Sequence, residues 1–146
     1  MLKFSRKTLL AFEAVLDIAY NARPEPVQSK DITRRLGIPQ RYLEQVMQQL
    51  VREGVLKGVR GPRGGYTLAR ERRRITVAEI VRIVDEVDDE EEPLSSPLGA
   101  AVARPLWRGA QEAVLSQLEN VTMQDLCDEA EQRGVKRADA APDFAI

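Results

Sequence analysis

Two helical patterns and a glycine-rich turn follow one another in residues 29–70, SKDITRRLGIPQRYLEQVMQQLVREGVLKGVRGPRGGYTLAR. The first pattern covers two turns and stops at Gly37, a residue suited to the left-handed cap of a helix. Pro39 begins the second pattern, in which apolar residues recur three and four positions apart as far as Gly54. Two helices joined so tightly predict a helix-turn-helix, whose second helix is suited to a DNA major groove. On these residues alone, an ordinary helical hairpin explains the pattern equally well.

Two short β-prone stretches follow at residues 55–60 and 66–69, and they flank the turn GPRGG at residues 61–65. This pattern predicts a β-hairpin, which beside a helix-turn-helix forms a wing. Its tip lacks bulky apolar residues and carries Arg60 and Arg63 on a slender arm, which suits the narrow minor groove of DNA. The alternative is a plain exposed turn whose arginines only keep it soluble.

Helical patterns also lie on both sides of this stretch. Ser5 is placed to cap a first helix, which must end where two prolines force a turn. After the predicted hairpin, residues 75–87 show the apolar spacing of a helix, with Thr76 as its cap and Glu79 completing a capping box. Together with the hairpin, these helices are enough to enclose a small core.

An acidic stretch follows the last of these helices. Residues 85–92, DEVDDEEE, are acidic at seven of eight positions and run into a segment with Pro93 and Pro97. Repulsion between the carboxylates and the two prolines together predict a linker or mobile loop over residues 88–103. Binding of a divalent cation is the alternative, but the carboxylates lack the spacing of a calcium-binding loop.

A long amphipathic helix is predicted over residues 104–120, beyond the acidic stretch. Because the N-terminal elements already form a core, this helix needs a partner for its apolar stripe, and a second copy of the chain is the economical choice. The alternative is that the helix folds back on its own domain. The candidate residues of the dimer interface are Leu106, Trp107, Ala110, Val114, Leu118 and Val121.

These patterns predict a chain that is mainly α-helical with a small β wing. Residues 1–87 are expected to form a winged helix-turn-helix DNA-binding domain, followed by the linker or loop over residues 88–103. Residues 104–134 then contain the long dimerisation helix and a short last helix capped by Thr122. Residues 135–146 are expected to be a flexible tail.

Charges are divided unevenly along the chain. Residues 1–74 hold 16 Lys and Arg against 7 Asp and Glu, a net charge of +9. Residues 75–146 hold 6 against 16, a net charge of −10. The basic half is therefore a candidate for binding a polyanion. The same polyanion would repel the acidic half, which more naturally faces solvent or another protein.

The composition excludes several classes of chemistry. The 146 residues include one Cys and no His, so Ser-His-Asp and Cys-His catalysis, His-ligated zinc and an internal disulfide are excluded within the chain. We therefore do not expect an enzyme. Residues 1–20 are interrupted by Glu13 and Asp17 and predict neither a signal peptide nor a membrane span. A reducing, cytoplasmic location is the default expectation.

Five motifs occur in order along most of the chain. They are YLEQ at residues 42–45, VRGPRGGYTLAR at 59–70, ITVAEIVRIVDEV at 75–87, PLWR at 105–108 and LENVTMQDL at 118–126. In this order they resemble the Rrf-two family of bacterial winged-helix transcriptional regulators, over about residues 1–130. The resemblance implies a homodimer that binds double-stranded DNA at a palindromic operator and acts as a repressor.

The resemblance also places the expected DNA contacts on the helix-turn-helix and the wing. They fall on Ser29, Pro39, Gln40, Arg41, Tyr42, Glu44, Arg60, Gly61, Arg63 and Gly64. Side-chain chemistry agrees in part, because Arg41 can donate two hydrogen bonds to guanine O6 and N7, and Gln40 can pair with adenine. Tyr42 can reach a phosphate.

Members of this family that bind an iron–sulfur cluster carry three cysteines between the fourth and fifth helices and one further ligand before a Leu-Trp pair. Here Ser95, Ser96, Ala101 and Arg104 stand near those positions. Without thiolates such a cluster has no ligands, so no cofactor is expected. Divergence explains the rewritten, acidic loop better than engineered removal of cysteines. The remaining thiol, Cys127, is expected to be a small buried apolar residue rather than a redox sensor.

A function from another class stays open at this point. In this alternative, the chain acts mainly by binding a protein co-regulator through its acidic C-terminal half, and DNA binding is secondary. The resemblance to the CymR branch of the family suggests a metabolic enzyme such as cysteine synthase as that partner. Capture of partners by residues 75–146 alone would separate the two hypotheses.

Overall fold

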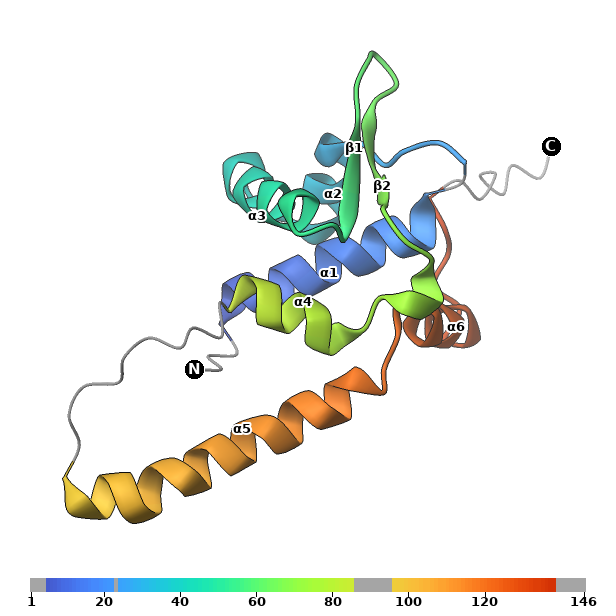
Figure 1. Ribbon diagram of the computed structural model, residues 1–146. Helices are drawn as coiled ribbons and strands as arrows, with labels where there is room; N and C mark the ends of the chain where they lie inside the picture. Colours follow the sequence, from blue (N-terminus) through green and yellow to red (C-terminus); the bar gives the residue numbers. More distant parts are fainter. Residues whose placement is uncertain (1–4, 23, 86–95, 139–146) are drawn as a thin grey trace.

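Helix α1 (Arg6–Asn21) lies at the centre of the fold (Figure 1). The computed structural model describes residues 5–22, 24–85 and 96–138. Ser5 caps α1 as expected, since its hydroxyl accepts a hydrogen bond from the backbone N–H of Thr8 at 3.2 Å. Eight of the 16 residues of α1 are buried, because other elements pack against it from several sides.

The predicted helix-turn-helix is confirmed. It consists of α2 (Ser29–Leu36) and α3 (Gln40–Arg52). Gly37 between them has the left-handed φ of 66° that ends α2. Pro39, expected in the first turn of the second helix, lies one position earlier, at the cap of α3.

The predicted wing is confirmed as well. Strands β1 (Leu56–Val59) and β2 (Gly65–Leu68) pair antiparallel in a two-stranded sheet that projects from the helices (Figure 1). At its tip Gly61 has a φ of 112°, a backbone conformation that other residues rarely adopt. A 3₁₀ turn, η1 (Arg72–Arg74), follows β2. The molecule is thus mainly α-helical with a small β wing, the fold class that the sequence predicts.

One residue outside the hairpin adds a further strand contact. The N–H of Val27 donates to the carbonyl oxygen of Tyr66 at 2.9 Å, and the N–H of Tyr66 donates to that of Val27 at 2.8 Å. Val27 precedes α2, so this bridge ties the wing to the start of the helix-turn-helix. No sequence pattern predicts it.

Helix α4 (Val77–Val84) is shorter than the helix predicted over residues 75–87. The last two positions of that range lie outside the described residues. Thr76 caps α4 as expected, because its hydroxyl accepts from the N–H of Glu79 at 3.2 Å. In a capping box, the carboxylate of Glu79 would also accept from the backbone N–H of Thr76. Here this carboxylate pairs with Arg70 instead.

The long helix α5 (Arg104–Glu119) begins earlier than the sequence predicts. A π-helical segment, η2 (Gly99–Ala103), precedes it, and helical backbone starts at Pro97. The expected linker over residues 88–103 is therefore helical in its last part, while its first part lies outside the described residues. The hydroxyl of Ser96 accepts a hydrogen bond at 3.1 Å from the N–H three residues later and so caps this helix. Within the described ranges, neither α5 nor any other helix is long and apolar enough to span a membrane.

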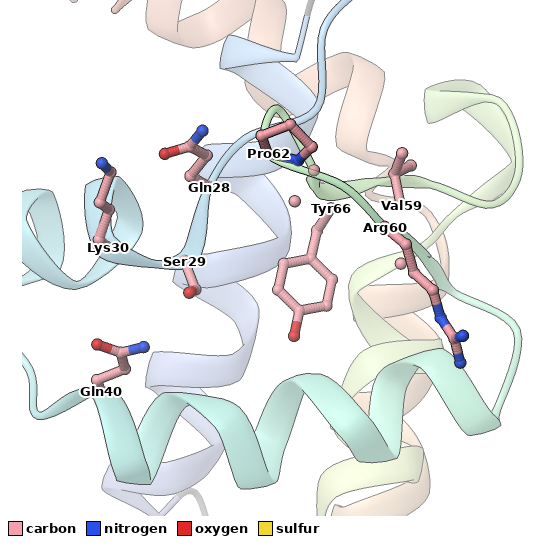
Figure 2. A pocket seen from close by; sticks show the side chains of 11 residues that line it. Gln28, Ser29, Lys30, Gln40, Val59, Arg60, Pro62 and Tyr66 are labelled. Atoms are coloured by element: carbon pink, nitrogen blue, oxygen red, sulfur yellow. The ribbon is translucent and has the colours of Figure 1, made fainter.

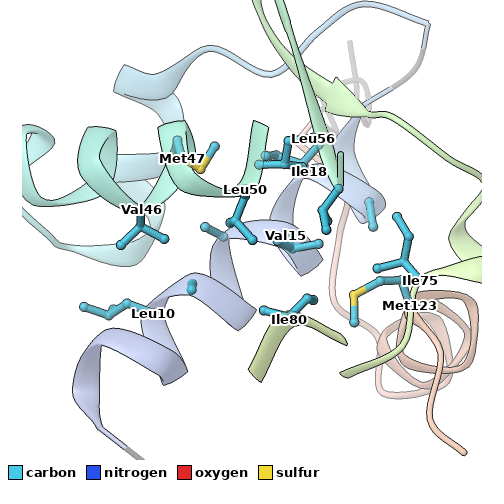
Figure 3. Close-up of a cluster of buried hydrophobic side chains, with 14 of the residues drawn as sticks. Leu10, Val15, Ile18, Val46, Met47, Leu50, Leu56, Ile75, Ile80 and Met123 are labelled. Carbon is cyan, nitrogen blue, oxygen red and sulfur yellow. The ribbon is translucent and has the colours of Figure 1, made fainter. Parts of the chain in front are cut away.

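Helix α6 (Met123–Gln132) joins the N-terminal elements. Backbone hydrogen bonds on both sides of Thr122 connect its start to the segment before α4. The buried side chains of Met123 and Cys127 belong to the same core as those of α1 and α3, so residues 104–134 do not form a core of their own. Figure 3 shows part of this core, including Leu10, Val15, Ile18, Met47, Leu50, Ile80 and Met123.

The first part of the expected flexible tail, residues 135–138, is held against the end of α1. The hydroxyl of Tyr20 donates to the carbonyl oxygen of Val135. The guanidinium of Arg137 lies over the Tyr20 ring, 4.9 Å from its centroid, and donates to the Tyr20 carbonyl at 3.2 Å. The rest of the tail lies outside the described residues.

Candidate nucleic-acid interface

A cavity of about 600 Å³ lies between the wing and the starts of α2 and α3 (Figure 2). Its lining includes Ser29, Gln40, Arg60 and Gly64, so the fold brings together predicted DNA contacts from three separate elements. The bridge between β2 and the segment before α2 fixes how far apart these elements stand. The helix-turn-helix and the wing therefore form one continuous surface.

Helix α3 presents one face to the core and another to solvent. Its buried residues are Leu43, Val46, Met47 and Leu50. Gln40, Arg41 and Glu44 are exposed, and the side-chain amide of Gln40 donates to the carboxylate of Glu44 at 3.1 Å. Tyr42 is half-buried and packs against the core.

Close backbone contacts determine the shape of the wing. A Cβ atom on Gly64 would lie 2.2 Å from a carbonyl oxygen of β1, and one on Gly65 would lie 2.3 Å from the carbonyl oxygen of Val27. Neither position accepts a side chain unless the backbone moves. Arg60 and Arg63 are exposed on this narrow arm, as a wing that enters a minor groove requires.

The arginines of the basic half fall into two groups. Some are paired within the chain: ion pairs join Arg34 to Asp31, Arg35 to Asp17, Arg70 to Glu79 and Arg73 to Glu71. In contrast, Arg41, Arg60 and Arg63 form no ion pair with any residue in the described part of the chain. These three charges are available to phosphates and base edges.

Three polar side chains of this surface are not among the residues that the sequence predicts. Gln28, Lys30 and Tyr66 line the cavity beside the predicted contacts (Figure 2). Burial and the nearby carboxylate of Glu44 raise the pKa of Tyr66, so its hydroxyl keeps its proton and can donate a hydrogen bond. Lys30 could have been predicted from the sequence, because it lies in the first turn of α2, next to the predicted contact Ser29.

The predicted dimer-interface residues of α5 divide into two groups. Leu106 is 74% exposed and Trp107 58% exposed, and Ala110 is exposed as well. Val114 is half-buried, and Leu118 and Val121 pack against the core of their own chain, which corresponds to the alternative expectation for this helix. Sequence analysis missed Leu115, which is the buried residue of α5.

The residues of this chain do not fit an iron–sulfur cluster. The hydroxyl of Ser96 caps a helix, and Ala101 and Arg104 are part of helical backbone, while Ser95 lies outside the described residues. The only thiol, Cys127, is buried in the core, where burial raises its pKa against the opposing effect of Arg72. Cluster irons require thiolate ligands, and one buried thiol per chain cannot supply them.

Comparison with known proteins gives a consistent assignment. A family model described as Rrf2, iron-dependent transcriptional regulator, matches residues 4–129. The HTH-type transcriptional regulator IscR of Xenorhabdus nematophila is 34% identical over 129 residues, which cover 86% of this chain and 79% of that protein. The protein rrf2 of Nitratidesulfovibrio vulgaris is 31% identical over 134 residues, which cover 88% of this chain and 89% of that protein.

Solved structures agree with this result. IscR of T. potens superposes with a TM-score of 0.76 at 31% identity, covering 93% of both chains. CymR, the global cysteine regulator of B. subtilis, superposes with a TM-score of 0.73 at 30% identity, covering 88% of this chain and 98% of that one. The chain therefore belongs to the Rrf2 family of winged-helix, DNA-binding transcriptional regulators.

Proposed function

We propose that this protein is a homodimeric repressor that binds a palindromic operator through α3 and the wing, without an iron–sulfur cluster. The observation that carries the proposal is the joint surface of the helix-turn-helix and the wing, where Arg41, Arg60 and Arg63 have no ion-pair partner within the described residues. Family membership favours DNA binding over the alternative in which protein binding is the main activity.

Each element has a separate task in this proposal. The start of α3 enters the major groove, where Arg41 donates to guanine and the carboxylate of Glu44 accepts from cytosine N4. The hydrogen bond between Gln40 and Glu44 holds both side chains in one orientation. The wing follows the adjacent minor groove with Arg60 and Arg63, which respond to groove width more than to base identity.

The exposed part of α5 supports a dimer. Val102, Leu106 and Trp107 are exposed to solvent. The first part of the helix extends away from the other elements (Figure 1). Val102 and Leu106 lie four residues apart, and Gly109 and Ala113 on the same helical face allow a second helix to approach closely. We propose that the same helix of a second chain covers this face.

An operator selected from a random pool of duplex DNA tests the proposal directly. The recovered sequence is expected to contain two inverted half-sites about 10 base pairs apart, because two recognition helices related by a twofold axis enter successive major grooves. Placed between a promoter and a reporter gene, this operator should lower transcription when the protein is expressed. Recovery of a single half-site would contradict the homodimer. Activation of the reporter would contradict the role as a repressor.

Removing the arginines of the wing should weaken operator binding. For Arg60→Ala and Arg63→Ala we expect the slope of log affinity against log salt concentration to fall by about 1 for each lost phosphate contact. A contact inside the minor groove would also reduce the preference for A·T-rich positions. Fluorescence anisotropy over a salt titration measures both effects.

The matched control for the wing is Arg73→Ala. Arg73 is exposed like the wing arginines, but it pairs with Glu71 in η1, outside the joint surface. Its replacement should leave the salt dependence unchanged. Parental slopes for both wing variants would show that the wing does not contact DNA.

The absence of a cluster makes a simple prediction. Protein purified without oxygen should be colourless and contain no iron, because a homodimer would contribute only two thiols, both buried in separate cores. Visible absorption and metal analysis check this. Iron at about one cluster per chain would contradict the proposal.

A further inference from the structure

A second cavity, of about 380 Å³, lies between the end of α1, strand β2 and η1. It shares no lining residue with the cavity of the nucleic-acid interface. Its lining includes Ile18, Ala19, Ala22, Thr67, Leu68 and Arg72. A volume of this size is ordinary for a site that takes a small molecule.

The chemistry of this lining is mainly apolar with one cation. Ala22 and Leu68 are half-buried and offer hydrocarbon surface to the cavity, and the fully buried Ile18 lies behind them in its wall. Arg72 is half-buried and is the charged residue of the lining. The hydroxyl of Thr67 adds a neutral hydrogen-bonding group.

The chain satisfies part of the hydrogen-bonding capacity of Arg72. One nitrogen donates to the carbonyl oxygen of Ala19 at 3.3 Å, and the side chain also forms a hydrogen bond with the thiol of Cys127, whereas a guanidinium has five N–H donors. Among the residues that the structure describes, no carboxylate forms an ion pair with Arg72, although its neighbour Arg73 is paired with Glu71. A half-buried cation with no counter-ion among the described residues is best complemented by an anion, and a carboxylate matches its planar, two-pronged geometry.

We propose that this cavity binds a small aliphatic carboxylic acid. Its carboxylate pairs with Arg72, and its alkyl chain lies against Ala22 and Leu68. The apolar lining disfavours a strongly hydrated anion such as inorganic phosphate, which would gain nothing from the hydrocarbon surface.

The position of the cavity couples it to the wing. Thr67 and Leu68 line this cavity, while Gly65 and Tyr66 on the same strand line the cavity of the nucleic-acid interface. A ligand would therefore contact β2 directly beside the bridge that fixes the wing to the helix-turn-helix. This regulatory consequence rests on the proposed function, whereas ligand binding itself does not.

The probe for binding is 4-methylpentanoate, and its uncharged amide, 4-methylpentanamide, is the matched control. We expect the acid to shift the methyl resonances of Ile18 and Leu68 saturably in spectra of the full-length protein without DNA. The amide should bind at least about tenfold more weakly, because it keeps the alkyl chain but lacks the charge that pairs with Arg72.

Three variants test the site. Arg72→Gln should weaken binding of the acid at least about tenfold, whereas Arg73→Gln should leave it unchanged, since Arg73 is exposed and outside the lining. Ala22→Leu places a side chain in the cavity and leaves Arg72 intact, so it should reduce binding by steric exclusion. Because Arg72→Gln also loses the bond to Ala19, thermal unfolding of each variant must show that it is folded.

The outcomes are distinct. No saturable shift up to the solubility limit of the acid, equal binding of acid and amide, or parental binding by both Arg72→Gln and Ala22→Leu would overturn the proposal. None of these results depends on DNA, so the proposed function would stand. If the acid binds but operator affinity is the same with and without it, the coupling to the wing is wrong.

Discussion

Replacing Leu106 with Glu is expected to convert the proposed dimer into a folded monomer and to lower affinity for the full operator at least about 100-fold. Leu106 is 74% exposed in the single chain, so a carboxylate there costs the monomer little. In the proposed dimer the same change buries unpaired carboxylates between two copies of α5, at a cost of several kcal/mol. Each half-site alone then provides only half of the phosphate and base contacts.

Sedimentation velocity and circular dichroism check the two parts of this expectation. The variant should sediment near the 16.4 kDa of one chain and keep the helical spectrum of the parent. Gln111→Glu is the control, because it adds the same charge to a partly exposed position of α5 on the side of the helix opposite this apolar face. A Leu106→Glu protein that still dimerises and binds the operator like the parent would place the interface elsewhere.

The choice of residue in this experiment depends on the structure. Sequence analysis assigned the whole stripe of α5 to the dimer, which makes Leu118 as good a target as Leu106. In the structure Leu118 packs against the core of its own chain, so Leu118→Glu would destabilise the monomer whatever the state of the dimer. Spacing along a helix shows which residues share a face. It does not show which of them pack within their own chain and which are left for a second chain.

Local signals predicted most of the N-terminal half. The Ser5 cap, the left-handed Gly37 and the glycine-rich turn of the wing each act within a few residues, and all are present in the structure. The start of the long helix was also signalled locally but was misinterpreted. Ser96 followed by Pro97 is a favourable helix start, although a proline in an acidic segment also fits a linker.

Tertiary contacts account for the remaining differences. The bonds from the end of α1 to residues 135–138 join positions more than 100 residues apart, and no periodic pattern encodes them. The family resemblance places Tyr42 among the DNA contacts, but only the structure shows that it also packs against the core. The bridge at Val27 is a single residue pair, too short to appear as a strand pattern.

That bridge leads to a prediction with a large effect. Gly65→Ala should lower stability by about 1–3 kcal/mol and operator affinity at least about tenfold, because the new Cβ needs space that the backbone occupies. It would lie 2.3 Å from the carbonyl oxygen of Val27, closer than any real contact, so the strand or the segment before α2 must move. The two hydrogen bonds between Val27 and Tyr66 are then lost or lengthened, and the wing no longer keeps its distance from α3.

Gly58→Ala provides the control on the neighbouring strand. A Cβ on Gly58 meets nothing within 4 Å, although Gly58 pairs with Tyr66 in the same sheet. Chemical denaturation should therefore separate the two alanine variants, with the stability of Gly58→Ala close to that of the parent. Anisotropy with the selected operator then measures the affinity that Gly65→Ala loses. If Gly65→Ala loses stability but keeps operator affinity, the wing takes its position from the DNA rather than from the Val27 bridge. If the two variants are equally stable, the backbone near Gly65 accommodates the new Cβ without loss of stability.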